Sequence, residues 1–175
     1  LIETGAEVAV VGGDATERST VSRLFDECRN SFSAEADLVV VNAGKGLKGS
    51  LLNSDPDGWA EMLTLNVHSA LYLMREAALR MIEDVNKNGR FSRPRDIVVL
   101  GSCVGKNVLA RSSIYSATKF AVHSAAEALR REICNHGIRV SLIEPGIVET
   151  EFHDVARYGD NFYQESADSI GPLLK

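Results

Sequence analysis

Four short apolar runs, rich in β-branched residues, constrain the fold of this 175-residue chain more than any other feature. None of them alternates apolar with polar residues, so we expect strands buried on both faces, as in a parallel sheet covered by helices. The runs cover residues 7–11, 37–41, 96–100 and 139–143. Between them, apolar residues three and four positions apart predict helices over residues 20–30, 57–84 and 113–135. This alternation predicts an α/β fold with a doubly wound parallel sheet and helices on both faces.

Composition narrows the class of protein. With 45% apolar residues, the chain can bury one core. The net charge of −5 argues against a nucleic acid or an anionic membrane as partner, and no apolar run reaches the length of a membrane span or resembles a signal peptide. The three cysteines are far apart and lack metal-ligand spacing, which predicts free thiols, no metal site and a cytoplasmic location.

Gly44–Gly49 matches the G-x-G-x-x-G pattern of dinucleotide-binding loops and follows a predicted strand. That function requires a helix that opens inside the pattern and an acidic residue about 20 positions further on, after a second strand. Here a polar loop follows and the next helix starts only at Asp57. We therefore do not expect this segment to be the main phosphate-binding loop.

Tyr115 and Lys119 carry the clearest chemical signal. Four residues make slightly more than one helical turn, so both side chains leave the same face of the predicted helix. An ammonium near a phenol stabilises the phenolate, and a tyrosine tuned in this way can exchange a proton with a carbonyl or alcohol oxygen. Ser102 ends a predicted strand, where ligands bind in open α/β sheets, and can donate a hydrogen bond to the same oxygen. A serine hydrolase is disfavoured, because Gly-Ser-Cys-Val-Gly is not G-x-S-x-G.

Five patterns in chain order give the sequence its resemblance to a known family. They are Asn42-Ala43-Gly44 at a strand end, Asn66 in a helix, Ser102, the pair Tyr115 and Lys119, and Pro145-Gly146-x-Val148-x-Thr150. In this order and spacing the sequence resembles the short-chain dehydrogenase/reductase family. The resemblance implies a Rossmann-like fold and an NAD(P)(H)-dependent oxidoreductase acting on a ketone, aldehyde or secondary alcohol.

The resemblance also implies a role for each matching residue. Tyr115 would be the general acid/base, and Lys119 would assist it and hydrogen-bond the nicotinamide ribose. Ser102 would orient the substrate carbonyl, and Asn66 would hold a water that relays protons from Lys119. The cofactor-binding residues implied are Asp14, Ala15, Asn42, Ala43, Gly44, Tyr115, Lys119, Pro145, Gly146, Val148 and Thr150.

The two ends of the chain depart from the family pattern. Residues 7–11 match either the family's second strand, with Gly12-Gly13 replacing the residues that choose NAD or NADP, or its third strand. We favour the third strand, which makes Asp14 the contact to the adenine amino group. Residues 1–175 are then one Rossmann-like domain, incomplete at both ends and an internal piece of a longer enzyme. Residues 151–175 resemble the family's mobile substrate-covering segment, and the residues that would select the substrate are His153, Arg157, Tyr158, Phe162 and Tyr163.

Several expectations remain open at the level of the sequence. A cofactor-binding or scaffold protein without turnover is the main alternative function. The cofactor is NADP(H) or NAD(H), with a weak lean to NADP(H). The long apolar helices at 57–84 and 113–135 predict a homodimer or homotetramer, because the corresponding helices of the family pack in this way.

Overall fold

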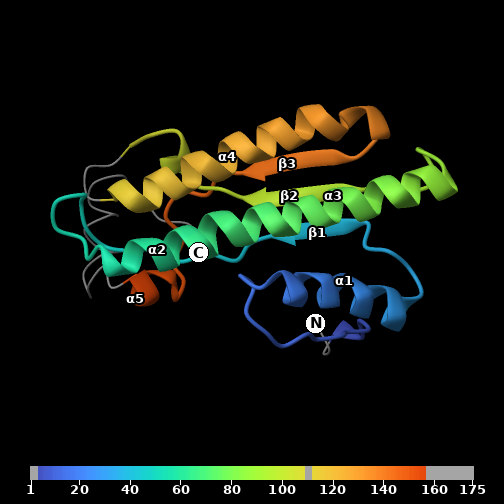
Figure 1. The fold of residues 1–175 in the computed structure, drawn as a ribbon, viewed down its shortest axis with the longest axis horizontal. Helices are drawn as coiled ribbons and strands as arrows, with labels where there is room; N and C mark the ends of the chain where they lie inside the picture. The colour runs from blue at the N-terminus through green and yellow to red at the C-terminus, as the bar shows by residue number, and fades with distance from the viewer. Residues whose placement is uncertain (1–3, 109–111, 157–175) are drawn as a thin grey trace.

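The computed structural model describes residues 4–108 and 112–156 of the chain. Its sheet has three parallel strands in the order β1-β2-β3. They are β1 (Leu38–Val41), β2 (Asp96–Leu100) and β3 (Arg139–Ile143). The strands end at the same edge, and α4 and α2 begin beside that edge (Figure 1). The parallel α/β architecture predicted from the apolar runs is confirmed.

The helices follow the predicted order, with end points that differ from the predicted ones by a few residues. The long ones are α1 (Arg18–Phe32), α3 (Ser69–Asn88) and α4 (Ser113–Ile133), and the shorter elements are α2 (Asp57–Leu63), η2 (Thr64–His68), η3 (Cys103–Gly105), η4 (Cys134–His136) and α5 (Phe152–Ala156). Element η2 is a π-helical turn that joins α2 to α3. Gly89 follows α3 and Gly137 follows η4, both at positive φ, where glycine is favoured because it has no Cβ. Among the described helices, none is both long and apolar enough to cross a bilayer.

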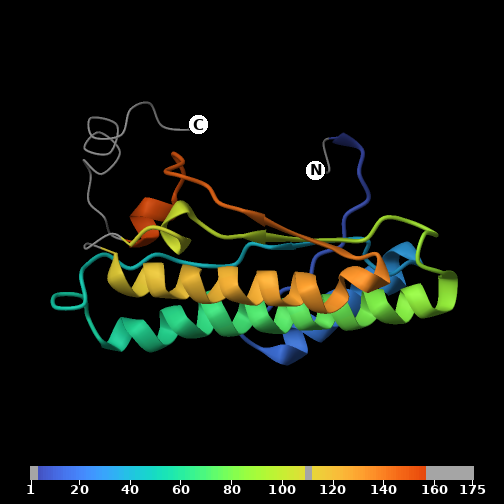
Figure 2. The ribbon, with the colours of Figure 1, turned by 90° about the horizontal axis from the view of Figure 1, so that it is seen from above.

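The helices α3 and α4 lie side by side over one face of the sheet, and α1 lies next to α3 beyond the β1 edge (Figures 1 and 2). Side chains on that face, such as Val39, Ile97 and Val140, are buried with the inner faces of the helices. The opposite face of the sheet is more open, and Leu38, Val40 and Ile143 are about half exposed. The prediction of burial on both faces is therefore wrong for β1 and β3, whereas the second face of β2 is half-buried; no described helix covers this face (Figure 2).

The predicted strand at residues 7–11 does not form. Val10 is 85% exposed and Val8 is 42% exposed. A strand needs a neighbour that accepts and donates its backbone hydrogen bonds, and no described strand pairs with this segment. The prediction of a strand at residues 7–11 is therefore wrong for the described structure, because an apolar pattern says nothing about whether a partner strand lies beside it.

Candidate active site

The loops that follow β2 and β3 are held together just beyond the sheet. The Gly101 N–H donates to the Ile143 carbonyl over 2.8 Å, and the Cys103 N–H donates to the Pro145 carbonyl over 3.0 Å. These bonds extend the parallel pairing past the last strand residues, so Ser102 and Pro145 lie in adjacent loops. Asn42, Ala43 and Gly44 continue from β1 at the same edge and are exposed. Three of the segments singled out by the sequence therefore meet at one edge.

The Lys119 side chain extends from α4 to the end of β2. It is buried, and Nζ donates a 2.9 Å hydrogen bond to the Leu100 carbonyl. The same Nζ lies 5.7 Å from the centre of the Tyr115 ring, which is near enough for a favourable cation–π contact. Burial lowers the pKa of Lys119 from 10.5 to about 8, because the charged form loses hydration. The lysine is thus a desolvated ammonium placed between the sheet edge and the phenol.

Tyr115 lies in the first turn of α4 and is partly buried. Its ring packs on Phe152 of α5, with 5.7 Å between the ring centres and a tilt of 55°. The segment after β1 also reaches α5, because the Lys48 N–H donates to the Ala156 carbonyl and Gly46 has no room for a Cβ beside Ala156. The short helix α5 therefore borders the tyrosine.

Ser102 is buried at the end of β2, in extended backbone. Its Oγ accepts a long hydrogen bond of 3.4 Å from the Val104 N–H, which caps η3. The hydroxyl proton has no acceptor among the described residues, so it remains available to a ligand oxygen. The Ser102 backbone N–H donates to Nε2 of His123 over 3.2 Å. Neighbouring groups therefore orient both the backbone N–H and the side-chain Oγ of Ser102.

Asn66 lies in the π-helical turn η2 and is buried. Its carboxamide pairs with both backbone groups of Lys45, accepting from the N–H and donating to the carbonyl, each over 2.8 Å. It also donates to Thr118 Oγ1 over 3.1 Å, and Thr118 in turn donates to the Tyr115 carbonyl. Asn66 thus ties the segment after β1 to the first turns of α4. π-Helical turns occur frequently at functional sites.

The remaining predicted cofactor residues are more dispersed. Asp14 precedes α1, and its Oδ1 accepts from the N–H and the hydroxyl of Thr16, both over 2.8 Å. These two hydrogen bonds lower the pKa of Asp14 below 3.8. Ala15 beside it is half-buried. Among the described residues, the side-chain hydrogen bonds of Asp14 stay within its own turn and do not reach Tyr115 or Ser102.

The end of the Pro145–Thr150 segment continues into α5. Pro145 and Val148 are half-buried, and Gly146 is exposed with open space where a side chain would be. Thr150 Oγ1 accepts from the Phe152 N–H, and the Thr150 carbonyl contacts Nδ1 of His153 over 2.8 Å. The other residues that we expect to select the substrate, at 157, 158, 162 and 163, lie outside the described residues.

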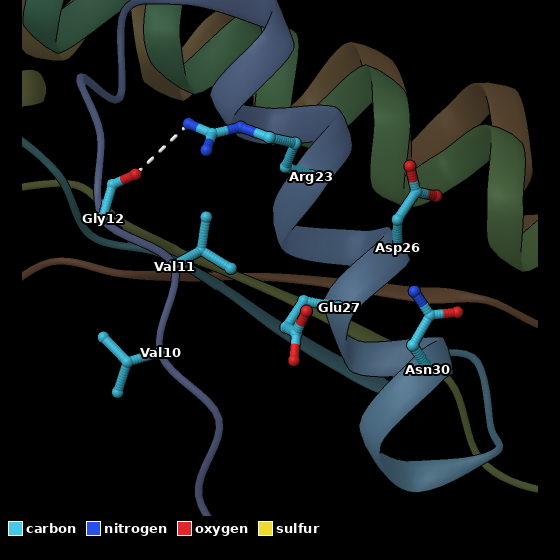
Figure 3. Close-up of a pocket in the computed structure, with 7 residues that line it drawn as sticks. All are labelled: Val10, Val11, Gly12, Arg23, Asp26, Glu27 and Asn30. Atoms are coloured by element: carbon cyan, nitrogen blue, oxygen red, sulfur yellow. Dashed lines mark hydrogen bonds between the residues drawn. The ribbon is translucent and has the colours of Figure 1, made fainter.

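A shallow pocket elsewhere lies between α1 and the segment at residues 10–12 (Figure 3). Arg23 closes one end by donating to the Gly12 carbonyl over 3.2 Å. Asp26 and Glu27 add acidic groups from α1. This pocket is beyond the β1 edge, and none of its lining residues belongs to the predicted catalytic set.

The structure adds residues to the site that the sequence patterns did not reveal. They are Lys45, Thr118, His123 and Phe152. His123 is buried against the Ser102 loop. Its position four residues after Lys119 was an available signal, since both then share a helix face. The Gly44–Gly49 pattern contains no helix, as its context predicted.

Comparisons with known proteins agree with this geometry. A family model described as short chain dehydrogenase matches residues 1–160. An uncharacterized oxidoreductase of Staphylococcus aureus (strain MRSA252) is 31% identical over 143 residues, which cover 82% of this chain and 58% of the relative. A similar oxidoreductase of Staphylococcus saprophyticus is 29% identical over 137 residues, or 78% of this chain and 55% of the relative.

Solved structures are similar as well. A short chain dehydrogenase/reductase from Burkholderia phymatum, in complex with NAD, has a TM-score of 0.77 and 29% identity and covers 92% of this chain and 55% of that one. One from Vibrio parahaemolyticus has a TM-score of 0.64 and 26% identity, covering 76% of this chain and 57% of that one. The chain thus spans less than two thirds of the length of the proteins it matches. The Rossmann-like class is confirmed by this similarity and by the parallel sheet.

Proposed function

The chain belongs to the short-chain dehydrogenase family, and from that premise we propose that the protein is an oxidoreductase that transfers a hydride between NAD(P)(H) and a ketone, aldehyde or secondary alcohol. One observation carries the proposal. A buried lysine ammonium lies one helical turn from a tyrosine, at the same sheet edge as a serine whose hydroxyl proton has no acceptor among the described residues. This arrangement suits proton exchange with an oxygen that gains or loses charge.

The chain's own residues support binding of a nicotinamide cofactor. Lys119 Nζ can donate three hydrogen bonds, and Leu100 is its one acceptor among the described residues, so ribose hydroxyls could accept the others. The exposed backbone at Asn42–Gly44 and the open space at Gly146 leave room for an extended ligand along the strand ends. When bound, the nicotinamide supplies or accepts the hydride.

For the cofactor, we keep the prediction of NADP(H) or NAD(H), with a weak preference for NADP(H). The similar structure from Burkholderia phymatum is in complex with NAD, which supports a nicotinamide dinucleotide of either kind. Oxidation rates of NADH and NADPH, measured with the same carbonyl compound, test the preference.

In the reductive direction, we assign the proton transfer to Tyr115. Its hydroxyl gives a proton to the carbonyl oxygen as negative charge develops there, and the Lys119 ammonium stabilises the phenolate that remains. The Ser102 hydroxyl donates a hydrogen bond to the same oxygen and holds it in place. Asn66 fixes the position of the segment after β1 relative to α4. Its Oδ1 retains a lone pair that can accept a hydrogen bond from a water in the proposed proton relay.

Substitution of Tyr115 tests the proposal. We expect Tyr115→Phe to reduce kcat by about 10²- to 10⁴-fold, the usual contribution of a general acid/base, while cofactor affinity stays nearly unchanged. Nicotinamide absorbance measures turnover, and quenching of protein fluorescence measures binding. Tyr72→Phe, which removes a hydroxyl that contacts Arg18 on the helix layer, is the matched control. An unchanged rate for Tyr115→Phe would refute the catalytic role.

The main alternative, a cofactor-binding or scaffold protein, makes a different prediction. Such a protein would bind NADH or NADPH but would oxidise neither with any aldehyde, ketone or secondary alcohol of a broad panel. The complete set of Asn66, Ser102, Tyr115 and Lys119 argues for turnover, because a scaffold has no need of a desolvated lysine.

We also propose a homodimer or homotetramer that works in the cytoplasm. Leu71, Leu79 and Phe120 on α3 and α4 are each 40% or more exposed, so the helix layer presents apolar side chains. The three free thiols support a reducing location. Sedimentation velocity at micromolar concentration tests the assembly, and a single monomeric species would contradict it.

A further inference from the structure

A buried histidine lies directly under the loop that carries Ser102. His123 is 8% exposed, and its Nε2 accepts the hydrogen bond from the Ser102 backbone N–H. The ring is enclosed by the loop itself, because a Cβ added at either Gly101 or Gly105 would overlap it. Both glycines are buried, so the loop packs directly against the imidazole. His123 therefore fills the space between α4 and the end of β2.

The hydrogen bond fixes the tautomer. A nitrogen that accepts from a backbone N–H carries no proton, so the neutral ring must hold its proton on Nδ1. Nδ1 is buried and has no hydrogen-bond partner among the described residues. It lies 3.6 Å from Oε1 of Glu144, too far for a normal hydrogen bond and near enough for an electrostatic attraction.

Three charged groups face this imidazole. Glu144 follows β3, Lys106 follows η3 and pairs with Glu144 over 2.7 Å, and Lys119 lies one turn earlier on α4. Burial lowers the pKa of His123, the Glu144 carboxylate raises it, and the two lysines lower it further. The net pKa lies below 6.5, so the neutral form dominates at neutral pH.

We propose that His123 is a positioning residue for Ser102, and that its protonation releases the Ser102 backbone and switches the site to a less active form. In the neutral state, Nε2 holds the Ser102 N–H and thereby the direction of its side chain. In the protonated state Nε2 carries a proton as well, so two donors face each other and the Ser102 loop must move. The inference rests on the proposed function for its effect on rate, but the geometry of the pair stands without it.

Two substitutions of nearly equal size separate positioning from packing. The terminal amide of glutamine can reach the place of Nε2 and accept from the Ser102 N–H, whereas asparagine is shorter and cannot. We expect His123→Gln to keep kcat near the native value at neutral pH, and His123→Asn to lower it by about 10- to 100-fold, as displacement of a reacting group does. His136→Gln, at the far end of α4, is the control for loss of a histidine.

The pH profile supplies the readout that a structural role would not change. The native protein should lose kcat on the acid side with an apparent pKa below 6.5, and His123→Gln should lack this limb because glutamine does not titrate. Lys106→Met should move the limb to higher pH, since it removes a positive charge close to Glu144 and His123. An acid limb that is the same in His123→Gln, or equal rates for the Gln and Asn variants, would overturn the proposal.

Nitrogen-15 NMR of histidine-labelled protein tests the pair without any turnover. We expect His123 as the Nδ1–H tautomer at neutral pH, with Nε2 unprotonated, and an Nε2–H tautomer would overturn the inference. If Tyr115→Phe loses turnover while His123→Asn matches the native rate, this inference fails and the proposed function stands. Conversely, the protein could reduce no carbonyl compound and still show the Nδ1–H tautomer of His123 with a pKa below 6.5. In that case the proposed function fails, and the hydrogen bond by which His123 positions Ser102 stands.

Discussion

The Lys119 ammonium lies over the Tyr115 ring, 5.7 Å from its centre, while a hydrogen bond ties the same nitrogen to the last carbonyl of β2. The lysine therefore links the helix that carries the tyrosine to the strand that leads to Ser102. Burial of a charge without a carboxylate partner costs stability. The same burial strengthens the interaction of the ammonium with the phenol, because electrostatic interactions are stronger where water is excluded.

The first prediction concerns the stability cost of Lys119. Its pKa falls from 10.5 to about 8 on folding, so the folded state binds fewer protons than the unfolded chain between these values. The cost therefore grows as the pH falls from about 10.5 to 8 and is complete at pH 7. We expect Lys119→Met to raise the free energy of unfolding at pH 7 by about 1–3 kcal/mol, with turnover lost.

Urea denaturation at pH 7 and pH 10 measures this effect. The gain in stability should shrink at pH 10, where the native lysine is neutral in the folded state. Lys48→Met, on an exposed side chain, controls for the added apolar group and should change little at either pH. A Lys119→Met variant less stable than the native protein at pH 7 would contradict the burial argument.

The second prediction concerns a buried ion pair at the opposite end of the sheet. Asp84 accepts hydrogen bonds from Arg95, Arg93 and Asn88, and Arg95 is only 1% exposed. Asp84→Ala leaves the Arg95 guanidinium buried without its carboxylate. We expect a loss of about 3–5 kcal/mol in the free energy of unfolding, the usual penalty for an uncompensated buried charge.

The pH dependence of this pair has a definite sign. Burial alone raises the pKa of Asp84, but hydrogen bonds from Arg95, Asn88 and Arg93 outweigh it and bring the pKa below 3.8. The stability from Asp84 is therefore present above pH 3.8 and is lost as the pH falls below it. In thermal melts at a series of pH values, the Tm difference between the native protein and Asp84→Ala should be largest above pH 3.8 and should shrink as the pH falls below it. Glu83→Ala removes the neighbouring exposed carboxylate and should have little effect on Tm.

The parts of the fold and of the site that could be predicted from the sequence are those that depend on local interactions. The strands at 96–100 and 139–143 were predicted with the bounds observed, because each run is apolar and short. The four-residue spacing of Tyr115 and Lys119 places them one turn apart in any α-helix. By contrast, residues 7–11 carry the same apolar signal and form no strand, because pairing depends on a neighbour far away in the chain.

The missed parts of the site are also non-local. The π-helical turn at Thr64–His68 inserts a residue into a pattern of period 3.6, so the sequence showed one unbroken helix there. The spacing of His123 from Lys119 indicates the helix face that it shares, but its contact with the Ser102 loop arises because η3 packs on α4, which is not a local interaction. The open second face of the sheet was missed for the same reason, since an apolar run cannot show what covers it.

The third prediction concerns the carboxamide of Asn66. In Asn66→Asp both terminal atoms are oxygens, so the Lys45 carbonyl and Thr118 Oγ1 lose their donor. A carboxylate oxygen would instead face the Lys45 carbonyl oxygen. We expect a loss of about 1–3 kcal/mol, the cost of a buried acceptor without its donor. Equal urea midpoints for Asn66→Asp and for the exposed control Asn135→Asp would sink this prediction.

The last prediction tests how closely the Ser102 loop fits His123. Gly105→Ala places a methyl group where the imidazole lies, so either the loop or the ring must move. We expect a loss of about 1–3 kcal/mol in the free energy of unfolding, typical of overpacking, together with a lower kcat. Gly12→Ala, where a Cβ meets open space, should change neither quantity. In the double variant with His123→Ala, the methyl group enters the vacated space, so the two stability losses should be less than additive. Additive losses would show that Gly105 and His123 do not share this space.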